Sequence, residues 1–522
     1  MTDQAAVHGN SLSRPGPLAA EEPRWRQGPW LFLILLAVAV LVRAQTFGNP
    51  VIEFDEQFYR LVGERMLDGA VPYVDIWDRK PIGNFLIYAF AALVGGKGPI
   101  AYQLLATLFA TGTAFVLYGM ARHVAGWRGA LAAAIFYLLW LNLLQGEGGQ
   151  SSVFYTLPVC LAARLVLRHL AGPGRGTRVW LRDGAVAMAL LGAAIQIKYT
   201  VALEGALFGL AMLWTGRRAG LDMRTLAGVA LLWIGIALAP TLAVWGAYAA
   251  MGHGDTWLFA NVTSILKRDK LPTGPTIEDF LTGIGIILLP LLVALHAIRT
   301  AREREPALWF FGLWAATALL AILLLMTFSP HYWIPVMAPI LLVAAPVLGR
   351  AKVVTAGMGL LALVAGQILI GFFIVSKGDA RTVRNLVAAI GPTPNCLYVW
   401  DGFPALYNAA DSCLPSRFVF PGHLNYAPEA HALGVEATEE LRRILANRPD
   451  AVVTDEPAYE FVNRETLAIL NDALASHYVH VHAEKTGAAR WRHVYRIRPE
   501  YARQAGLEAS VPEMAGTRMV AR

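Results

Sequence analysis

Charged residues are scarce in this sequence. Asp, Glu, Lys and Arg make up 16% of its 522 residues, whereas 56% of the residues are hydrophobic. Soluble globular proteins average about a quarter charged residues. The shortage therefore excludes an ordinary soluble protein and indicates a chain that is solvated mainly by lipid.

Metal-binding and cofactor-binding patterns are also missing. The sequence has three cysteines and contains no H-E-x-x-H motif, no paired-cysteine set and no histidine pair at ligand spacing, so neither a metal site nor a cofactor is predicted. Cys160 lies in an apolar stretch and is expected to be an ordinary small apolar residue. Cys396 and Cys413 lie in the polar C-terminal part, where an oxidising compartment would permit a disulfide between them.

Eleven apolar stretches approach the length of about 20 residues that a helix needs to cross a bilayer. They are residues 30–45, 100–120, 129–143, 153–170, 184–197, 201–214, 225–250, 280–298, 307–326, 334–348 and 353–375. No A-x-A cleavage pattern follows the first stretch, so we interpret it as a retained anchor behind a disordered tail at residues 1–28. The predicted fold class is an α-helical polytopic membrane protein with about eleven transmembrane helices in residues 29–375.

The distribution of charge orients these helices. Five short loops hold 15 Lys and Arg against four acids: residues 122–128, 164–183, 216–224, 299–305 and 350–352. Basic loops favour the cytoplasm, so the N-terminus is expected inside and residues after 375 outside. The net charge of +7 then needs no nucleic-acid partner. The predicted location is a bacterial inner membrane, with the C-terminal part in the periplasm.

Two outer regions are predicted to be structured. The first outer loop, residues 46–99, is long and charged, and we expect interfacial helices at residues 56–67 and 82–94. Residues 376–500 have an ordinary soluble composition and predict a small α/β domain. Its expected strands are residues 396–400 and 451–454, with a hairpin of 477–483 and 490–496, and its expected helices are residues 433–447 and 465–475. A flexible tail is expected at residues 501–522.

The adjacent acids Asp55 and Glu56 begin the first interfacial helix. They could simply stabilise the helix N-terminus, which is worth about 0.3–1 kcal/mol. Alternatively, Asp55 faces a cavity and accepts a proton from an attacking hydroxyl, with a pKa raised by partial desolvation near lipid. Further along the loop, Arg79 and Lys80 either anchor the chain at the interface or hold a phosphate at head-group depth.

This first loop resembles that of the GT-C glycosyltransferases. The resemblance rests on Asp55-Glu56 with Tyr59, the Pro72-Tyr73 turn with Asp75, and Lys80-Pro81, and it continues at His331-Tyr332 and in the segments around residues 398–400, 406–407 and 416–417. It is closest to the protein mannosyltransferase-like branch, which includes the lipid A aminoarabinose and galacturonic acid transferases. Many relatives have a second proline after Lys-Pro, whereas this chain has Ile82-Gly83.

The resemblance implies transfer of a monosaccharide from a polyprenyl-phosphate donor on the outer membrane face, without a metal. The implied acceptor is an envelope glycolipid, a glycan or a protein hydroxyl. Asp55 would be the base, with Glu56 beside it. Candidate ligands of the donor phosphate are Lys80, Arg79, Lys198, His331 and Tyr332, and candidate substrate contacts are Tyr59, Asp75 and Glu147.

Several of these assignments have structural alternatives. Glu147 could be a solvated loop residue, Lys198 could extend to the interface, and His331-Tyr332 could be an interfacial anchor. Glu204, inside an apolar stretch, is either functional or paired with Lys198. Asn261 and the charged residues 267–270 could belong to a mobile substrate loop, but we interpret them as an ordinary solvated loop.

Two other classes of function compete with the enzyme. A transporter or flippase of a lipid-linked sugar would also be polytopic, but it usually shows repeated halves, and no internal repeat is evident here. A noncatalytic scaffold on the same fold is the third possibility. Loss of sugar transfer on substitution of Asp55 would distinguish the enzyme from both.

Overall fold

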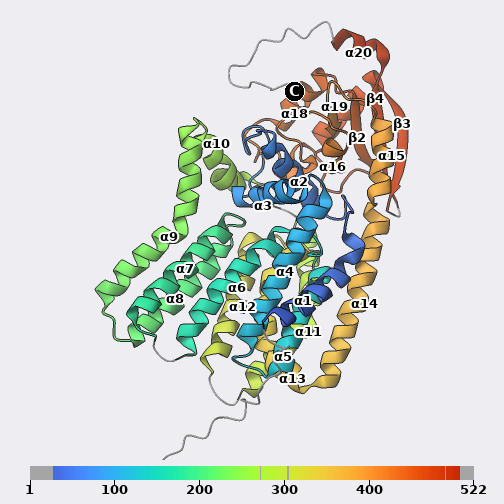
Figure 1. Ribbon diagram of the computed structural model, residues 1–522. Coiled ribbons are helices and arrows are strands. Elements are labelled where there is room, and N and C mark those ends of the chain that lie inside the picture. The colour runs from blue at the N-terminus through green and yellow to red at the C-terminus, as the bar shows by residue number, and fades with distance from the viewer. Residues whose placement is uncertain (1–27, 173–174, 271, 302–304, 488, 506–522) are drawn as a thin grey trace, which may run out of the picture.

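A computed structural model describes residues 28–172, 175–270, 272–301, 305–487 and 489–505. Figure 1 shows a bundle of long helices, with the C-terminal part of the chain at one end of it and α2 and α3 between the two. The predicted tail at residues 1–28 lies almost entirely outside the described residues, as does the predicted tail beyond residue 505.

The helices of the bundle follow the apolar stretches of the sequence. They are α1 (Pro29–Arg43), α4 (Pro99–Ala121), α5 (Trp127–Leu143), α6 (Ser151–Leu170), α7 (Thr177–Ile195), α8 (Val201–Arg218), α9 (Met223–Ala250), α11 (Thr273–Thr300), α12 (Pro306–Leu325), α13 (Ile334–Arg350) and α14 (Lys352–Lys377). Each predicted stretch forms one of them. The prediction of a polytopic α-helical membrane protein is confirmed.

Within the described residues, eight helices are long and apolar enough to cross a membrane. The three bundle helices that fall short are α5, which has 17 residues, and α7 and α8, which each contain three charged residues. These three nevertheless pack against spanning helices: α5 against α13, and α7 and α8 against α6. They therefore belong to the same bundle.

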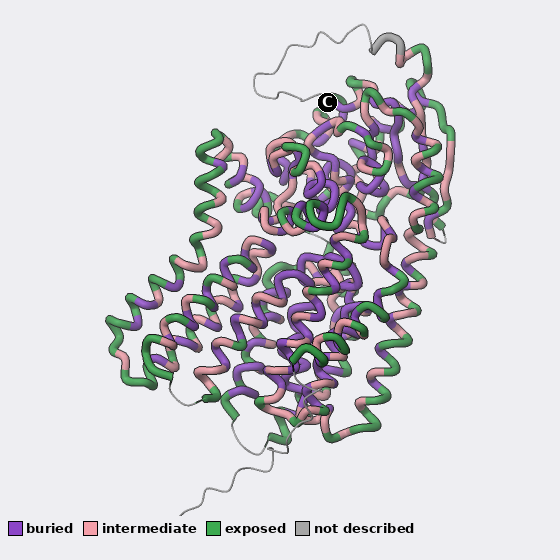
Figure 2. Tube along the Cα trace, viewed as in Figure 1, coloured by how far each residue is buried: buried purple, intermediate pink, exposed green. Residues whose placement is uncertain are grey.

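The bundle has a buried centre and an apolar outside. α13 packs against α5, α11 and α12, and every side chain from Ile334 to Ala345 is buried. In contrast, α9 and α14 lie at the two sides of the bundle and expose most of their length (Figure 2). Their exposed residues include Leu231, Leu242, Val354 and Phe372. In a bilayer such surfaces face lipid.

The first outer loop contains the two predicted helices. α2 (Phe54–Leu67) begins with Asp55 and Glu56 in its first turn, where acids favour a helix N-terminus, and Gly69 at φ 96° follows its end. α3 (Ile82–Gly95) is apolar but has only 14 residues, too few to span a bilayer. α2 and α3 pack against each other.

The C-terminal part contains a four-stranded sheet in the order β1-β2-β4-β3, with β1 parallel to β2 and the other pairs antiparallel. Its strands are β1 (Leu397–Val399), β2 (Ala451–Glu456), β3 (Tyr478–Thr486) and β4 (Arg490–Ile497), and its helices are α15 (Ala380–Ile390), α16 (Ala405–Ala409), α17 (Pro421–Leu424), α18 (Ala437–Ala446), α19 (Arg464–His477) and α20 (Pro499–Ala505). The predicted small α/β fold is confirmed, and α20 includes the first five residues of the predicted tail.

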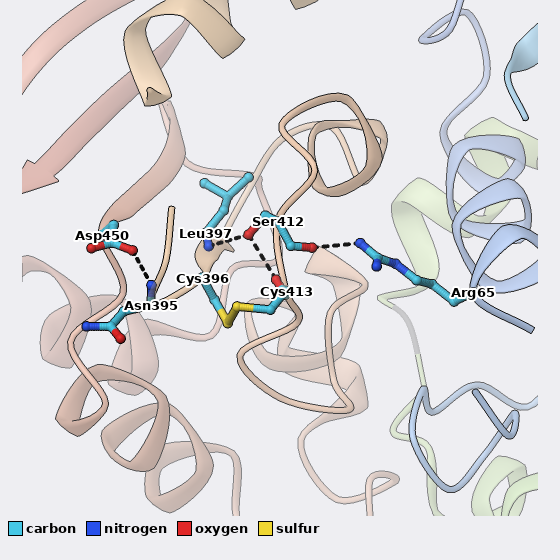
Figure 3. Close-up of a disulfide and its surroundings, with 7 residues drawn as sticks. All are labelled: Arg65, Asn395, Cys396, Leu397, Ser412, Cys413 and Asp450. Atoms are coloured by element: carbon cyan, nitrogen blue, oxygen red, sulfur yellow. Dashed lines mark hydrogen bonds between the residues drawn. A yellow bond between two sulfur atoms is a disulfide. The ribbon is translucent and has the colours of Figure 1, made fainter. Parts of the chain in front are cut away.

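A disulfide joins Cys396, just before β1, to Cys413 (Figure 3). Beside it, the Ser412 hydroxyl accepts a hydrogen bond from the Leu397 amide at 2.7 Å. The Ser412 carbonyl accepts another, at 2.6 Å, from the Arg65 guanidinium of α2. The Glu64 carboxylate of α2 also accepts a hydrogen bond from Asn408 at 2.6 Å. These contacts attach the C-terminal part to the first outer loop.

Candidate active site

A cavity of about 940 Å³ lies where the first outer loop, the bundle and the C-terminal part meet. Its lining residues are Asp55, Phe58, Tyr59, Asp78, Arg79 and Lys80 of the first loop; Lys198; Ile265, Arg268, Asp269 and Lys270; Thr273, Thr276, Ile277 and Phe280 of α11; residues 323–328 at the end of α12; Tyr332; and Phe420, Gly422, His423, Tyr426 and Glu429 of the C-terminal part. The first loop supplies four of the charged lining residues: Asp55, Asp78, Arg79 and Lys80.

Asp55 is the central acid of this cavity. It lies in the first turn of α2, and the Tyr59 hydroxyl, one turn later, donates a hydrogen bond to its Oδ2 at 3.1 Å. The spacing of four residues places both side chains on the same face of the helix. Asp55 is thus oriented toward the cavity by a neighbour from its own helix.

Two lysines lie near Asp55. The Nζ atom of Lys80 is 5.4 Å from the ring centroid of Tyr59, and that of Lys198 is 3.6 Å from the ring centroid of Tyr332. Burial lowers the pKa of Lys198 well below its usual value, and the charge of Lys80 lowers it further. The two lysines belong to separate loops, yet they lie close enough for the charge of one to affect the pKa of the other.

Gly83 explains how these loops approach so closely. A Cβ atom at this position would lie 2.5 Å from the backbone oxygen of Gln196. The start of α3 can therefore pack directly on the turn that carries Lys198 only because residue 83 has no side chain. Gly83 directly follows Ile82, the residue that stands where many relatives have a second proline.

The pKa of Asp55 differs from the expectation. Burial acts to raise it, as expected from the sequence, but the charges of Lys80 and His331, the hydrogen bond from Tyr59 and the charge of Lys198 outweigh this effect. The pKa therefore lies below its ordinary value, and the prediction of a raised pKa is wrong. Asp55 is ionised at neutral pH and able to accept a proton.

The other end of the cavity is apolar. Ile265, Ile277, Phe280 and residues 323–325 line it, followed by Met326 and Phe328. Leu324 and Met326 are largely exposed on the outside of the bundle. The cavity therefore has a charged end at Asp55 and an apolar end at the lipid-facing surface of α11 and α12.

Comparison with solved structures identifies the fold. The crystal structure of ArnT from Cupriavidus metallidurans bound to undecaprenyl phosphate matches with a TM-score of 0.63 and 16% identity, covering 89% of this chain and 98% of that one. The apo structure of the same protein matches with a TM-score of 0.61 and 15% identity, over 89% and 97% of the two chains. This chain has the GT-C fold of ArnT. The resemblance inferred from the first loop is confirmed for the fold.

The other comparisons add little to the identification of the fold. The apo oligosaccharyltransferase of Archaeoglobus fulgidus covers 83% of this chain and 70% of its own, at 12% identity and a TM-score of 0.49, which is too weak to support an argument beyond that from ArnT. No family model matches the sequence, and no curated protein matches it. The likeness to ArnT is therefore one of structure rather than of sequence.

Four predicted site residues are held elsewhere or already paired. Glu56 and Glu147 are buried outside the cavity lining. Asp75 is also outside it and accepts a hydrogen bond from the Val71 amide at 2.7 Å within its own loop. Arg79 lines the cavity, but both of its terminal nitrogens bind the Glu429 carboxylate, at 2.8 and 2.6 Å.

Glu56 points to the loop after α5 rather than to the cavity. A Cβ atom at Gly148 would lie 2.2 Å from its Oε2, so the glycine leaves the space that this carboxyl group fills. Burial and the charge of Glu53 raise the pKa of Glu56 to about 8. Burial and Glu53 also raise the pKa of Glu147 well above its usual value. These buried acids lie behind the start of α2.

Two further candidates from the sequence, His331 and Glu204, also lie outside the cavity lining. The His331 ring lies 4.5 Å from the Tyr332 ring. Glu204 accepts a hydrogen bond from the Trp314 indole at 2.6 Å, which gives it a different partner from the suggested Lys198.

Several lining residues were not predicted from the sequence. Residues 267–270 were interpreted as an ordinary solvated loop; Asp269 and Lys270 are indeed exposed, but together with Arg268 they also line the cavity. Their clustered charge next to an apolar helix was the available signal. For His423, Tyr426 and Glu429 no signal was available, because nothing local in the sequence indicates that the C-terminal part reaches Asp55. No group of three or more His, Cys, Asp or Glu side chains within the described part of the chain is arranged to hold a metal ion.

Proposed function

We propose that this chain is a membrane glycosyltransferase that moves a monosaccharide from a polyprenyl-phosphate donor to a hydroxyl group of an envelope acceptor. The observation that carries the proposal is the two-ended cavity, with Asp55, Lys80 and Lys198 at one end and an apolar wall of α11 and α12 at the other. An anionic head group on a long hydrocarbon tail fits both ends at once. The ArnT structure of the same fold holds undecaprenyl phosphate.

The charged end supplies the groups that such a transfer needs. Asp55 takes the proton of the acceptor hydroxyl, and the acceptor oxygen forms a bond to the anomeric carbon of the sugar. The bond between that carbon and the phosphate oxygen breaks, and the polyprenyl phosphate leaves with the bonding electrons. Lys80 stabilises the negative charge that develops on the phosphate. Lys198 does so as well, because a bound phosphate raises its lowered pKa and favours the charged form.

Donor binding also strengthens the base. The lysines that lower the pKa of Asp55 are the ones facing the donor phosphate in this proposal. A bound phosphate neutralises part of their charge, so the pKa of Asp55 rises when the donor is in place. The base is therefore weak in the empty cavity and stronger beside its substrate.

The reaction belongs on the extracytoplasmic face in this proposal. The described residues of the basic loops lie at the opposite end of the bundle from the first outer loop (Figure 1), and Lys and Arg favour the cytoplasmic side. The C-terminal part, with its disulfide, is then in the periplasm, where oxidising conditions maintain such bonds.

The test is turnover of a panel of radiolabelled polyprenyl-phosphate sugars by the purified protein in native lipids, with Asp55→Asn alongside. We expect one donor to be turned over and the variant to lose about 10²–10⁴-fold of the rate, the usual contribution of a general base. Asp68→Asn is the matched control, because Asp68 lies in the same loop but pairs with Lys97 at the surface. Equal turnover by Asp55→Asn would remove Asp55 as the base, and no turnover of any donor would overturn the proposal.

A further inference from the structure

Three aromatic side chains of the C-terminal part form a cluster beside the cavity. The ring centroids of Tyr426 and Tyr459 are 5.9 Å apart, those of Tyr426 and Phe461 6.2 Å, and those of Tyr459 and Phe461 5.9 Å. The backbone holds the two segments together, since the Ala427 amide donates a hydrogen bond to the Phe461 oxygen at 2.9 Å. We call Tyr426, Tyr459 and Phe461 the aromatic cluster.

The aromatic cluster connects the cavity with the surface. Tyr426 lines the cavity, where the Arg268 guanidinium lies 5.9 Å from its ring centroid. Tyr459 is 48% exposed. Neighbouring aromatic rings therefore lead from the cavity at Tyr426 to the exposed Tyr459.

Several charged groups act electrostatically on Tyr459, at the exposed end of the aromatic cluster. Burial raises the pKa of Tyr459, and so do the charges of Asp279 at the start of α11 and of Glu460. Arg490 and Asp401, which form an ion pair at 2.6 Å, also act on this tyrosine. Groups of both charges therefore act on Tyr459.

We propose that the aromatic cluster is the acceptor subsite and that the acceptor is a carbohydrate, whose sugar rings stack on Tyr459 and Phe461 while one hydroxyl reaches Asp55. The inference rests on the proposed transferase function and specifies its acceptor. A sugar ring has an apolar face of C–H groups and a rim of hydroxyls. It matches aromatic faces bordered by a few polar groups, the usual composition of small-molecule sites.

Membrane anchoring is the competing role for exposed tyrosines near a bilayer. It accounts less well for the aromatic cluster, because the rings pack on one another and the charges of Asp279, Glu460 and the Arg490–Asp401 pair act on Tyr459. An anchor would direct its rings into lipid. A membrane anchor would also not need to be connected to the cavity, as the aromatic cluster is through Tyr426.

The experiment measures binding and transfer with the full chain in nanodiscs. The probe is the mixture of water-soluble oligosaccharides that mild acid releases from the envelope glycolipids of the cells that make this protein. Variants are Tyr459→Ala, Phe461→Ala and the ring-preserving Tyr459→Phe. Trp491→Ala is the matched control, because Trp491 is 44% exposed in the same part of the chain but lies outside the aromatic cluster.

We expect Tyr459→Ala and Phe461→Ala to weaken oligosaccharide binding and to raise the acceptor KM by about tenfold with less change in kcat. Tyr459→Phe and Trp491→Ala should bind normally. Absence of oligosaccharide binding by the unmodified protein, or equal binding by all variants, would overturn the inference. A fall in kcat without a change in KM would also overturn it and would favour an anchoring role. Binding that depends on the aromatic cluster in a protein that turns over no donor would instead count against the transferase.

Discussion

Two neighbouring carboxyl groups at the start of α2 face different parts of the molecule. Successive helical residues point about 100° apart, so Asp55 meets Lys80 in the cavity while Glu56 enters the space beside Gly148. The pKa of Asp55 is lowered, and that of Glu56 is raised to about 8 by burial. The sequence motif could not separate the two residues, because it contains no information on what faces each of them.

Glu56 makes stability depend on pH. Its pKa rises on folding from 4.5 to about 8, so the folded state binds the proton more tightly than the unfolded state. The stabilisation from this proton is complete below the unfolded value and is lost as the pH rises through the folded value. We therefore expect the Tm of the unmodified protein to fall relative to that of Glu56→Gln between about pH 5 and about pH 9, by a few °C.

Thermal unfolding of the purified protein across this range measures the effect. Glu439→Gln on α18 is the control, because Glu439 is exposed. A constant difference in Tm between Glu56→Gln and the unmodified protein at every pH would contradict the prediction.

Most elements of the fold follow from local patterns in the sequence. Long apolar stretches produced all eleven bundle helices, and the alternation around residues 477–496 produced the β3–β4 hairpin. The contacts between elements were harder to predict from the sequence. In the sequence, Ile82-Gly83 was notable only because many relatives have a second proline after Lys-Pro. In the structure, Gly83 allows α3 to pack on the turn at Gln196, next to Lys198.

Gly83→Ala tests this contact. The new Cβ atom would meet a backbone oxygen that has little freedom to move, so α3 and the Lys198 turn must separate. Overpacking of this kind costs about 1–3 kcal/mol, and we expect sugar transfer to fall by about tenfold or more because Lys80 and Lys198 no longer face one phosphate. Unfolding and transfer assays measure the two effects.

Gly235→Ala in α9 is the matched control, because Gly235 is also helical and a Cβ atom there would meet nothing within 4 Å. This variant should keep full activity and gain up to about 1 kcal/mol of helix stability. Similar behaviour of the two variants would show that the contact at Gly83 is unimportant.

At the scale of the whole molecule, the cavity joins parts of the chain that are far apart in sequence. Glu429 of the C-terminal part pairs with Arg79 of the first loop at 2.6 Å and with Arg268, which precedes α11, at 2.8 Å. Sequence patterns predicted each part separately. They could not predict that Glu429 pairs with Arg79 and Arg268, because ion pairs between distant parts of the chain depend on how the helices pack.

Glu429→Gln should loosen this junction. Two arginines would lose their shared carboxylate, and we expect a loss of about 2 kcal/mol, below the ~3–5 kcal/mol for a fully buried pair because Arg268 is a quarter exposed. Adding Arg268→Met to this variant should recover part of the loss, since one unpaired charge is then removed. Denaturant unfolding of the single and double variants measures the coupling. Strictly additive losses would contradict a shared junction.

The residues that line the cavity are synthesised at different times. Asp55 and Lys80 belong to the first loop to leave the ribosome, whereas His423, Tyr426 and Glu429 are made only after every bundle helix has been synthesised. A partly synthesised chain therefore carries the proposed base but lacks the part of the cavity wall that these three residues form. Because the last segment made completes the wall, we expect that a nascent or truncated protein does not consume the polyprenyl-phosphate donor of the proposed reaction.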